Sequence, residues 1–253
     1  MTANHTDPTT TEAAQHRTDA DAWARPVDRL TVSEGSGGLA SAVAGRRVAG
    51  PLQGFGQMWQ KTFRARLPEG TAISPEEVVA AWKEEFPTFW PKGNTFYAPL
   101  AGIRPGEVAL LSVSAAGPMK LHSGVLVLYA DQEAFTLMTP EGHMLAAWIT
   151  FGATRGPDGA VLLQIQALER TSDPLFELGY VLGGSRLNNR FWEATLRNVA
   201  ARFGAVEPVV QAEVICVDRR RQWRYVRNVR HNTGFRSALY GMAAPLRMLR
   251  RRR

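Results

Sequence analysis

The sequence predicts an α+β fold in which an antiparallel sheet wraps around one long C-terminal helix. Two observations lead to this prediction. Residues 97–203 run as a series of short apolar segments separated by turn residues, and such close spacing is typical of an antiparallel meander rather than of βαβ units. One long segment with helical periodicity closes the series. This arrangement encloses an apolar pocket, so we expect a protein that binds or modifies a mostly apolar small molecule.

The first elements of the folded body have clear local signals. Residues 57–67 alternate apolar and polar side chains, which predicts a strand. Ser74 and Glu77 have the spacing of a capping box, and Pro75 suits the first helical position. We therefore expect a helix that begins after Ser74 and ends before Pro87.

Five further strands are predicted between turns that contain Gly, Pro and Asp. They cover residues 107–114, 121–129, 134–139, 146–153 and 161–168. The turn Gly156-Pro157-Asp158-Gly159 is a strong hairpin signal. One more strand, 209–217, is expected at the edge of the sheet.

The long helix is predicted from residue 174 to about residue 203. Asp173 or Ser172 is the expected N-cap, with Pro174 in the first turn. An apolar stripe runs along one face of its second half. Gly183-Gly184 interrupts the helical pattern, and this pair either allows close packing on the sheet or forms a hinge at the mouth of the pocket.

The charge of the chain is unevenly distributed. The net charge is +7, but residues 219–253 hold 12 arginines and no acidic residue, whereas the first 218 residues hold 18 basic and 23 acidic side chains. A cationic tail on a mildly acidic body indicates an anionic partner, either a membrane surface or nucleic acid. The residues expected to contact this partner are Arg219, Arg220, Arg221, Trp223, Arg224, Arg250 and Arg251.

Three segments are expected: a disordered N-terminal segment and linker over 1–50, a ligand-binding domain over 51–218, and the arginine-rich tail over 219–253. The tail contains an apolar stripe at helical spacing over 235–249. This stripe is suited either to a membrane interface or to docking on the body of the protein.

Cys216 is the single cysteine, and it lies in an apolar run, so we expect a small buried strand residue. A single cysteine permits no intramolecular disulfide, which fits a reducing compartment. The five histidines have no partners at ligand spacing, so neither a metal site nor a cofactor is predicted. The chain shows no signal peptide and no apolar stretch long enough to span a bilayer. We expect a cytoplasmic protein, peripheral at the inner membrane surface.

The order of these elements resembles the START-like helix-grip architecture, which includes lipid-transfer domains, birch-pollen-allergen-type proteins and aromatic polyketide cyclases. Residues 123–203, about a third of the chain, resemble more narrowly a START-like family of plants and actinobacteria known only as a domain of unknown function. One matching motif is Gly142-His143 followed by the strand residues 148–151. The other matching residues are Ile165, Ala167, Arg170 and Pro174. The family often has an acidic residue shortly after the Gly-His turn, where this chain has Ala146 and Ala147.

Three large side chains, Tyr129, Trp148 and Trp192, lie on elements expected to face the cavity. They would either line the ligand space or fill it as ordinary core. Asn188 precedes Trp192 by one helical turn on the apolar stripe. A buried amide needs a hydrogen-bond partner, which would be a ligand or a water.

Two candidate residues lie at strand ends. His143 at the pocket rim could bind a ligand or move a proton near neutral pH, or it could be a turn histidine bonded to the backbone. Arg170 could pair with a ligand carboxylate, or with Glu169 as an ordinary surface pair.

The sequence leaves three hypotheses about function. The first is a START-like binding protein for a hydrophobic or amphipathic small molecule, held at an anionic membrane surface by the tail. The second is a cyclase-, aromatase- or hydrolase-like enzyme on the same scaffold, which requires His143, Arg170 or Tyr129 to converge inside the cavity. The third and least favoured is a nucleic-acid-associated protein that acts through its arginine tail.

Overall fold

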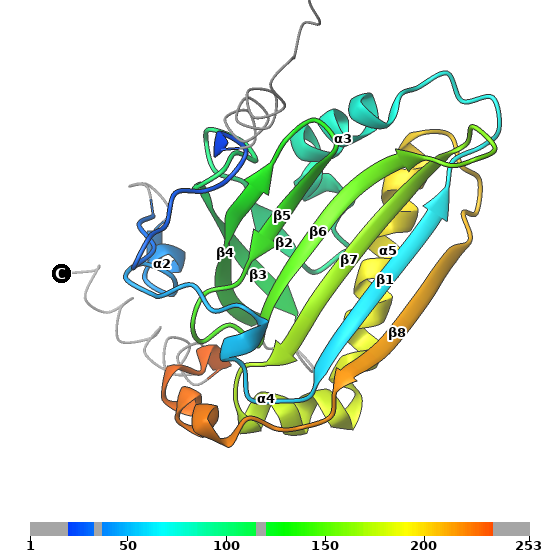
Figure 1. Cartoon of the computed structure of the whole chain (residues 1–253). Helices are drawn as coiled ribbons and strands as arrows, with labels where there is room; N and C mark the ends of the chain where they lie inside the picture. The colour runs from blue at the N-terminus through cyan, green and yellow to red at the C-terminus, as the bar shows by residue number, and fades with distance from the viewer. Residues whose placement is uncertain (1–19, 33–36, 115–119, 235–253) are drawn as a thin grey trace, which may run out of the picture.

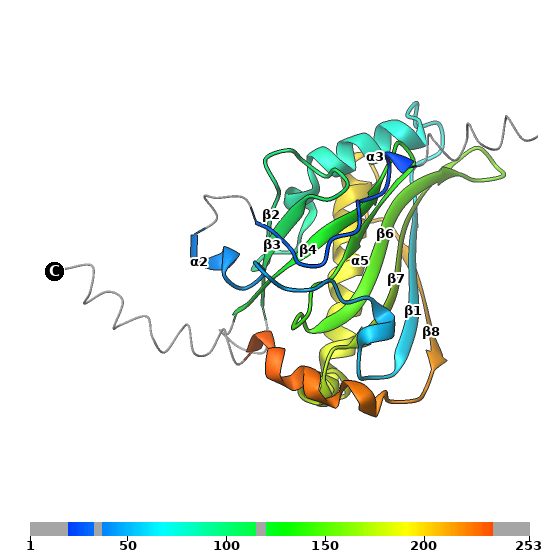
Figure 2. The same cartoon turned by 60° about the vertical axis from the view of Figure 1, so that its left-hand side comes forward.

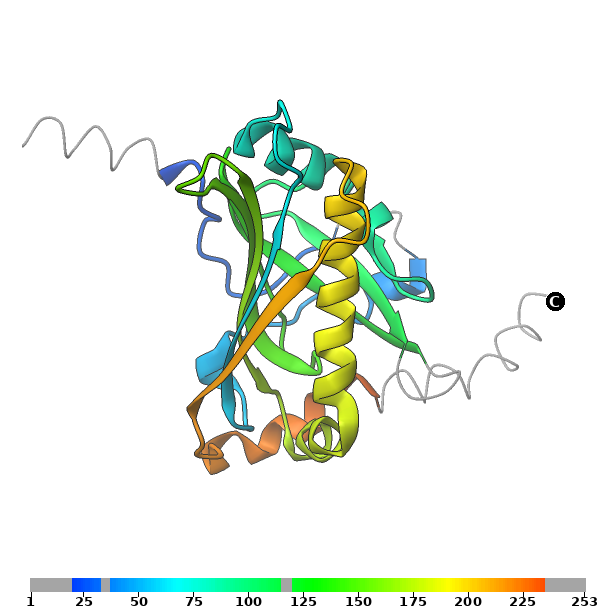
Figure 3. The ribbon, with the colours of Figure 1, turned by 90° about the vertical axis from the view of Figure 1, so that its right-hand side faces the viewer.

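The computed structural model describes residues 20–32, 37–114 and 120–234 (Figure 1). Eight antiparallel strands form one sheet in the order β2-β3-β4-β5-β6-β7-β1-β8. The sheet curves around the long helix α5, as Figure 3 shows most clearly. The predicted α+β architecture, with an antiparallel sheet around a long C-terminal helix, is confirmed.

The strands are β1 (Met58–Arg66), β2 (Thr95–Tyr97), β3 (Val108–Ser114), β4 (Lys120–Ala130), β5 (Ala134–Met138), β6 (Leu145–Arg155), β7 (Val161–Thr171) and β8 (Val210–Asp218). The helical elements are α2 (Gly37–Ala40), η1 (Pro51–Gln53), α3 (Pro75–Glu84), η2 (Phe86–Phe89), α4 (Pro174–Gly179), η3 (Tyr180–Gly184), α5 (Ser185–Arg202) and η4 (Trp223–His231). Sequence analysis identified every strand except the three-residue β2, which is too short to show a period.

The helices begin where the sequence signals place them. Ser74 and Glu77 form the predicted capping box at the start of α3. Asp173 caps α4 by accepting hydrogen bonds from the backbone N–H groups of Leu175 and Phe176. Gly183 has a φ of 134° inside η3, a conformation that favours glycine. The chain kinks there, so that α4 runs across the foot of α5 (Figure 3).

The core lies between the concave face of the sheet and the helices α3, η2 and α5. Aromatic rings fill much of it: Phe86 contacts Trp90, Phe96, Phe135 and Phe151 at centroid separations of 4.7–6.1 Å. These distances lie within the range of favourable edge-to-face packing. The half of the interior next to α3 is therefore occupied by the protein's own side chains.

The segment before residue 51, expected to be disordered or linker with a loosely docked part over 27–50, is partly docked. In its described parts, residues 20–32 and 37–50, Leu30 and Val43 are buried against Leu110 and Leu126 of the sheet. Figure 2 shows this segment crossing the convex face. A few isolated apolar residues in this polar, Gly-rich stretch show no periodicity, although together they bury a second small core.

The chain after β8 also packs on the body. Asn228 in η4 donates hydrogen bonds to the carbonyl groups of Gln53 and Ser172, each at 2.9 Å. Asn232 donates to the Asp173 carboxylate at 2.7 Å. The apolar stripe predicted over 235–249, together with Arg250 and Arg251, lies outside the described residues. Within the residues that are described, no helix has the length and apolar character needed to cross a membrane.

Candidate functional site

A buried ion pair lies in the interior, between the sheet and the long helix. Lys61 on β1 and Glu169 on β7 approach to 2.8 Å, and their side chains are 0 % and 1 % exposed. Strand pairing sets this geometry, because Trp59 pairs with Glu169 and Lys61 with Ala167, so both charged side chains point to the helix-covered face. Charges this deep in a protein are costly unless neighbouring groups satisfy them.

Side chains of η3 and α5 form the hydrogen bonds that the two buried charges need. The Tyr180 hydroxyl donates to Glu169 at 2.7 Å, and the Asn188 amide donates to both carboxylate oxygens at 3.0 and 3.2 Å. The Lys61 ammonium donates to the side-chain amide oxygen Oδ1 of Asn189 at 2.6 Å and lies 5.1 Å from the centre of the Tyr180 ring. We call these five residues the polar cluster. Glu169 therefore accepts hydrogen bonds from Tyr180 and Asn188 and forms an ion pair with Lys61.

The cluster fixes the protonation state of Tyr180. Burial, and then the negative charge of Glu169, raise the pKa of the Tyr180 hydroxyl far above its usual value. The hydroxyl keeps its proton at physiological pH and acts as a hydrogen-bond donor rather than as a base. Chemically, the cluster is suited to orienting a polar group of a ligand.

A pocket of about 620 Å³ opens beside the cluster, where α4, η3 and the start of β1 meet. Tyr180 belongs to both, because its ring lines the pocket while its hydroxyl reaches Glu169. Trp59, Val181 and Leu182 give the pocket apolar walls, and Arg186 stands on its lining. This volume lies within the range of small-molecule sites.

Two of the residues predicted to bind a ligand face this interior. Asn188 belongs to the polar cluster. Trp192, one turn later on α5, is buried among the aromatic rings of Phe151 and Phe191. Trp192 therefore fills the core, which is one of the two roles predicted for it from the sequence; the other was to line the ligand space.

Tyr129 and Trp148 do not face the cavity, contrary to expectation. A register irregularity between Val127 and Tyr129 reverses the inward and outward alternation of β4, so Tyr129 packs against Trp23 on the convex face. Trp148 is three residues before the buried Phe151 on β6, and the period of two therefore points it outward. There it lines a shallow pocket of about 200 Å³ on the outer face.

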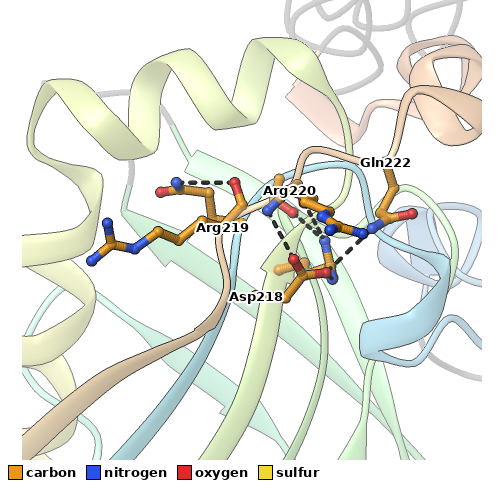
Figure 4. A network of polar contacts seen from close by, with 7 residues as sticks. Asp218, Arg219, Arg220 and Gln222 are labelled. Carbon is orange, nitrogen blue, oxygen red and sulfur yellow. Dashed lines mark hydrogen bonds and ion pairs between the residues drawn. The ribbon is translucent and has the colours of Figure 1, made fainter.

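Arg170 is also on the outer face, but it is buried. Its guanidinium donates to the backbone carbonyls of Gly56 at 2.6 Å and Arg220 at 2.9 Å, and it pairs with Asp218. Figure 4 shows this network at the end of β8. Arg170 thus joins β7 to the loops beside β1 and β8, and it is neither a ligand anchor nor a surface pair with Glu169.

His143 lies in the buried turn before β6. Its Nδ1 contacts the backbone of Leu145, at 2.9 Å from the carbonyl oxygen and 3.0 Å from the nitrogen of the N–H. Burial lowers the pKa of His143 from its ordinary 6.5 to about 4, although the Leu145 hydrogen bond and the charge of Glu169 partly oppose this shift. His143 is therefore neutral at physiological pH, as a turn histidine bonded to the backbone.

His143, Arg170 and Tyr129 do not converge inside the cavity, so the arrangement that an enzyme of the predicted kind requires is absent. Sequence reasoning missed Lys61, Glu169 and Tyr180 instead. A signal for the first two was present, because Lys61 shares the alternation of Phe63, and Glu169 shares that of Ile165 and Ala167. Within the described residues, no group of three or more His, Cys, Asp or Glu is arranged to hold a metal ion.

We expect the buried ion pair to be energetically coupled. Lys61→Met should destabilise the protein by about 3–5 kcal/mol, because it leaves the Glu169 carboxylate buried without its counter-charge. Adding Glu169→Gln should restore part of that loss, with a coupling energy of about 1–3 kcal/mol in a double-mutant cycle measured by urea unfolding. The exposed pair Arg197–Glu193, at 3.3 Å, is the matched control and should couple by less than about 0.5 kcal/mol. Additive effects at the buried pair would show that the two charges do not stabilise each other.

The neutral state of His143 should make stability depend on pH. The unfolded chain takes up a proton on this side chain near pH 6.5, whereas the folded protein does so only near pH 4. Stability should therefore fall as the pH drops from 6.5 to 4, by roughly 3 kcal/mol from this group. His143→Asn keeps an acceptor oxygen near the position of Nδ1 and should remove this part of the pH dependence in unfolding experiments. Parallel pH profiles for the two proteins would contradict the assignment.

Comparisons with known proteins find structures of low similarity and one matching family. Among solved structures, similar ones include Ara h 8.0201 (12 % identity, TM-score 0.39, 58 % of this chain and 97 % of that chain). Protein CV1439 from Chromobacterium violaceum is 17 % identical, with a TM-score of 0.39 over 56 % of this chain and 96 % of that chain. The di-domain ARO/CYC StfQ from the steffimycin biosynthetic pathway is 8 % identical, with a TM-score of 0.42 over 57 % and 50 %. These values are too low to carry an argument about function.

Among curated protein sequences, none matches the chain. One family model matches residues 63–204, from the middle of β1 to two residues beyond the end of α5. The match covers more than half of the chain. The chain belongs to the family described as a domain of unknown function, DUF1990.

Proposed function

We propose that this protein binds a hydrophobic or amphipathic small molecule in the pocket at the foot of α5. The observation that carries the proposal is the position of Tyr180, which joins the wall of a 620 Å³ pocket to a buried, rigidly hydrogen-bonded ion pair. Pockets with apolar walls and a few fixed polar groups are typical of small-molecule sites, because the walls give affinity and the polar groups give orientation.

The pocket lining suggests which ligand chemistry fits. Trp59, Val181 and Leu182 offer apolar surface, and the neutral Tyr180 and Gln57 offer hydrogen bonds. Arg186 adds an exposed positive charge that favours a carboxylate or another anionic group, whereas Glu177, also on the lining, is paired with Arg221. An elongated apolar or aromatic molecule with one polar or anionic end would use all of these features.

The size of the pocket depends on the kink at Gly183. Its positive φ turns α4 away from the axis of α5 and leaves space between η3 and β1. The aromatic rings around Phe86 fill the other end of the interior, so a ligand would enter at the foot of α5 rather than occupy the whole length of the sheet.

Ligand binding should be weakened by a charge on the pocket wall. Leu182→Asp places a carboxylate on the apolar wall and should weaken binding of the fluorescent probe 8-anilinonaphthalene-1-sulfonate by about tenfold, equivalent to about 1.4 kcal/mol. The matched control is Leu187→Asp, because Leu187, in the first turn of α5, is also exposed but does not line the pocket. Fluorescence titration of the two variants and the native protein makes the comparison.

The neutral probe N-phenyl-1-naphthylamine separates the contribution of charge. Arg186→Gln should weaken binding of the anionic probe several-fold and leave the neutral probe almost unaffected. Equal effects of Leu182→Asp and Leu187→Asp on both probes would place the binding site elsewhere and contradict the proposal.

A further inference from the structure

A row of exposed apolar side chains runs along α4 and η3. Leu175, Leu178, Val181 and Leu182 are between 46 % and 78 % exposed. Leu175, Leu178 and Leu182 follow the i, i+3, i+7 spacing that places side chains on one face of a helix. Trp223 at the start of η4 is 70 % exposed, while the edge of its ring contacts Phe55 at a centroid distance of 5.3 Å. Large apolar side chains gathered in this way mark an interaction site more often than isolated ones do.

The segments that carry this row and Trp223 also carry eight exposed arginines. They are Arg186, Arg190, Arg219, Arg220, Arg221, Arg224, Arg227 and Arg230. In the two segments that carry them, 174–190 and 219–234, the one acidic residue is Glu177, which is buried and forms an ion pair with Arg221 at 2.9 Å. The net charge of this surface is therefore strongly positive.

The two segments lie at the same end of the molecule. Figures 1, 2 and 3 all show η4 beside α4, below the foot of α5. The Arg221–Glu177 ion pair joins them directly. In Figure 4 the Arg219 side chain extends away from the Asp218 network rather than into it. We call this surface, formed by residues 174–190 and 219–230, the basal face.

We propose that the basal face docks on an anionic lipid bilayer. An apolar centre with a cationic rim matches the two layers of such a membrane surface, because leucines and a tryptophan can enter the boundary with the acyl chains while arginines contact the headgroups. The same charges could attract the phosphates of nucleic acid, but phosphate contact gives exposed leucines no apolar partner. The apolar row therefore favours the bilayer.

This docking does not depend on the identity of the pocket ligand, although the pocket opens on the same face. Val181 and Leu182 belong both to the apolar row and to the pocket lining. Docking would therefore bring the mouth of the pocket to the lipid interface. The variants chosen for the test, at Leu175 and Leu178, lie outside the pocket lining, so that a failure of docking and a failure of ligand binding can be told apart.

A fluorescent label can report which face meets the membrane. In a full-length Cys216→Ser background, Leu178→Cys carries an environment-sensitive nitrobenzoxadiazole dye on the basal face. Val206→Cys carries it beyond the far end of α5, where the side chain is 90 % exposed. Phosphatidylglycerol vesicles should raise the emission of the dye several-fold and shift it to the blue at position 178 only, and phosphatidylcholine vesicles should change neither label. Equal responses at the two positions, or none at 178, would overturn the proposal.

Vesicle sedimentation measures the contribution of the apolar row. Leu175→Asp with Leu178→Asp should weaken binding to phosphatidylglycerol vesicles about tenfold, since it removes apolar insertion as well as changing charge. Val206→Asp with Val209→Asp makes the same charge change at exposed positions of the opposite end and should have little effect. Equal losses in the two double variants would mean attraction by charge alone, and tight binding of a DNA duplex without vesicle binding would mean a nucleic-acid partner. Either result would overturn the proposal.

Discussion

Lys61 and Glu169 come from neighbouring strands, and the groups that satisfy them come from the helical segment on the concave face. Through Tyr180, Asn188 and Asn189, the charged pair fixes η3 and the first turns of α5 against β1 and β7. Because an unpaired charge at this depth would be costly, the helix cannot slide or rotate on the sheet without breaking the cluster. The position of the kink at Gly183, and with it the pocket between η3 and β1, depends on this constraint.

The interior is divided into two chemically different halves. Near α3, aromatic rings around Phe86 and Phe151 pack edge to face and occupy the space beneath the sheet. Near the foot of α5, the polar cluster replaces that packing, and a surface pocket opens beside Tyr180. The aromatic rings fill the space near α3, and the polar cluster can orient a polar group of a ligand near the foot of α5. We therefore expect ligand binding at one end of the helix rather than along the sheet.

Much of the fold could be predicted from the sequence because its signals are local. The caps at Ser74 and Asp173, and the alternating strands between turns, depend only on nearby residues. The candidate site was harder to predict from the sequence. A bulge in β4 turns the Tyr129 side chain to the outer face of the sheet. Arg170 is covered by loops that are distant in the sequence. The pairing of Lys61 with Glu169 joins residues 108 positions apart, so no local pattern could reveal it, although alternation placed each on the buried face.

Native mass spectrometry of the full-length protein tests the central claim directly, because it detects a bound small molecule without assuming its identity. Protein purified from its own host, or incubated with a panel of lipids and aromatic metabolites, should carry one small molecule per chain, which denaturing extraction would release for identification. The Leu182→Asp protein should lose this adduct, and the Leu187→Asp protein should keep it. A protein that remains empty under all of these conditions would contradict the account and would mean that the pocket beside Tyr180 is not a binding site.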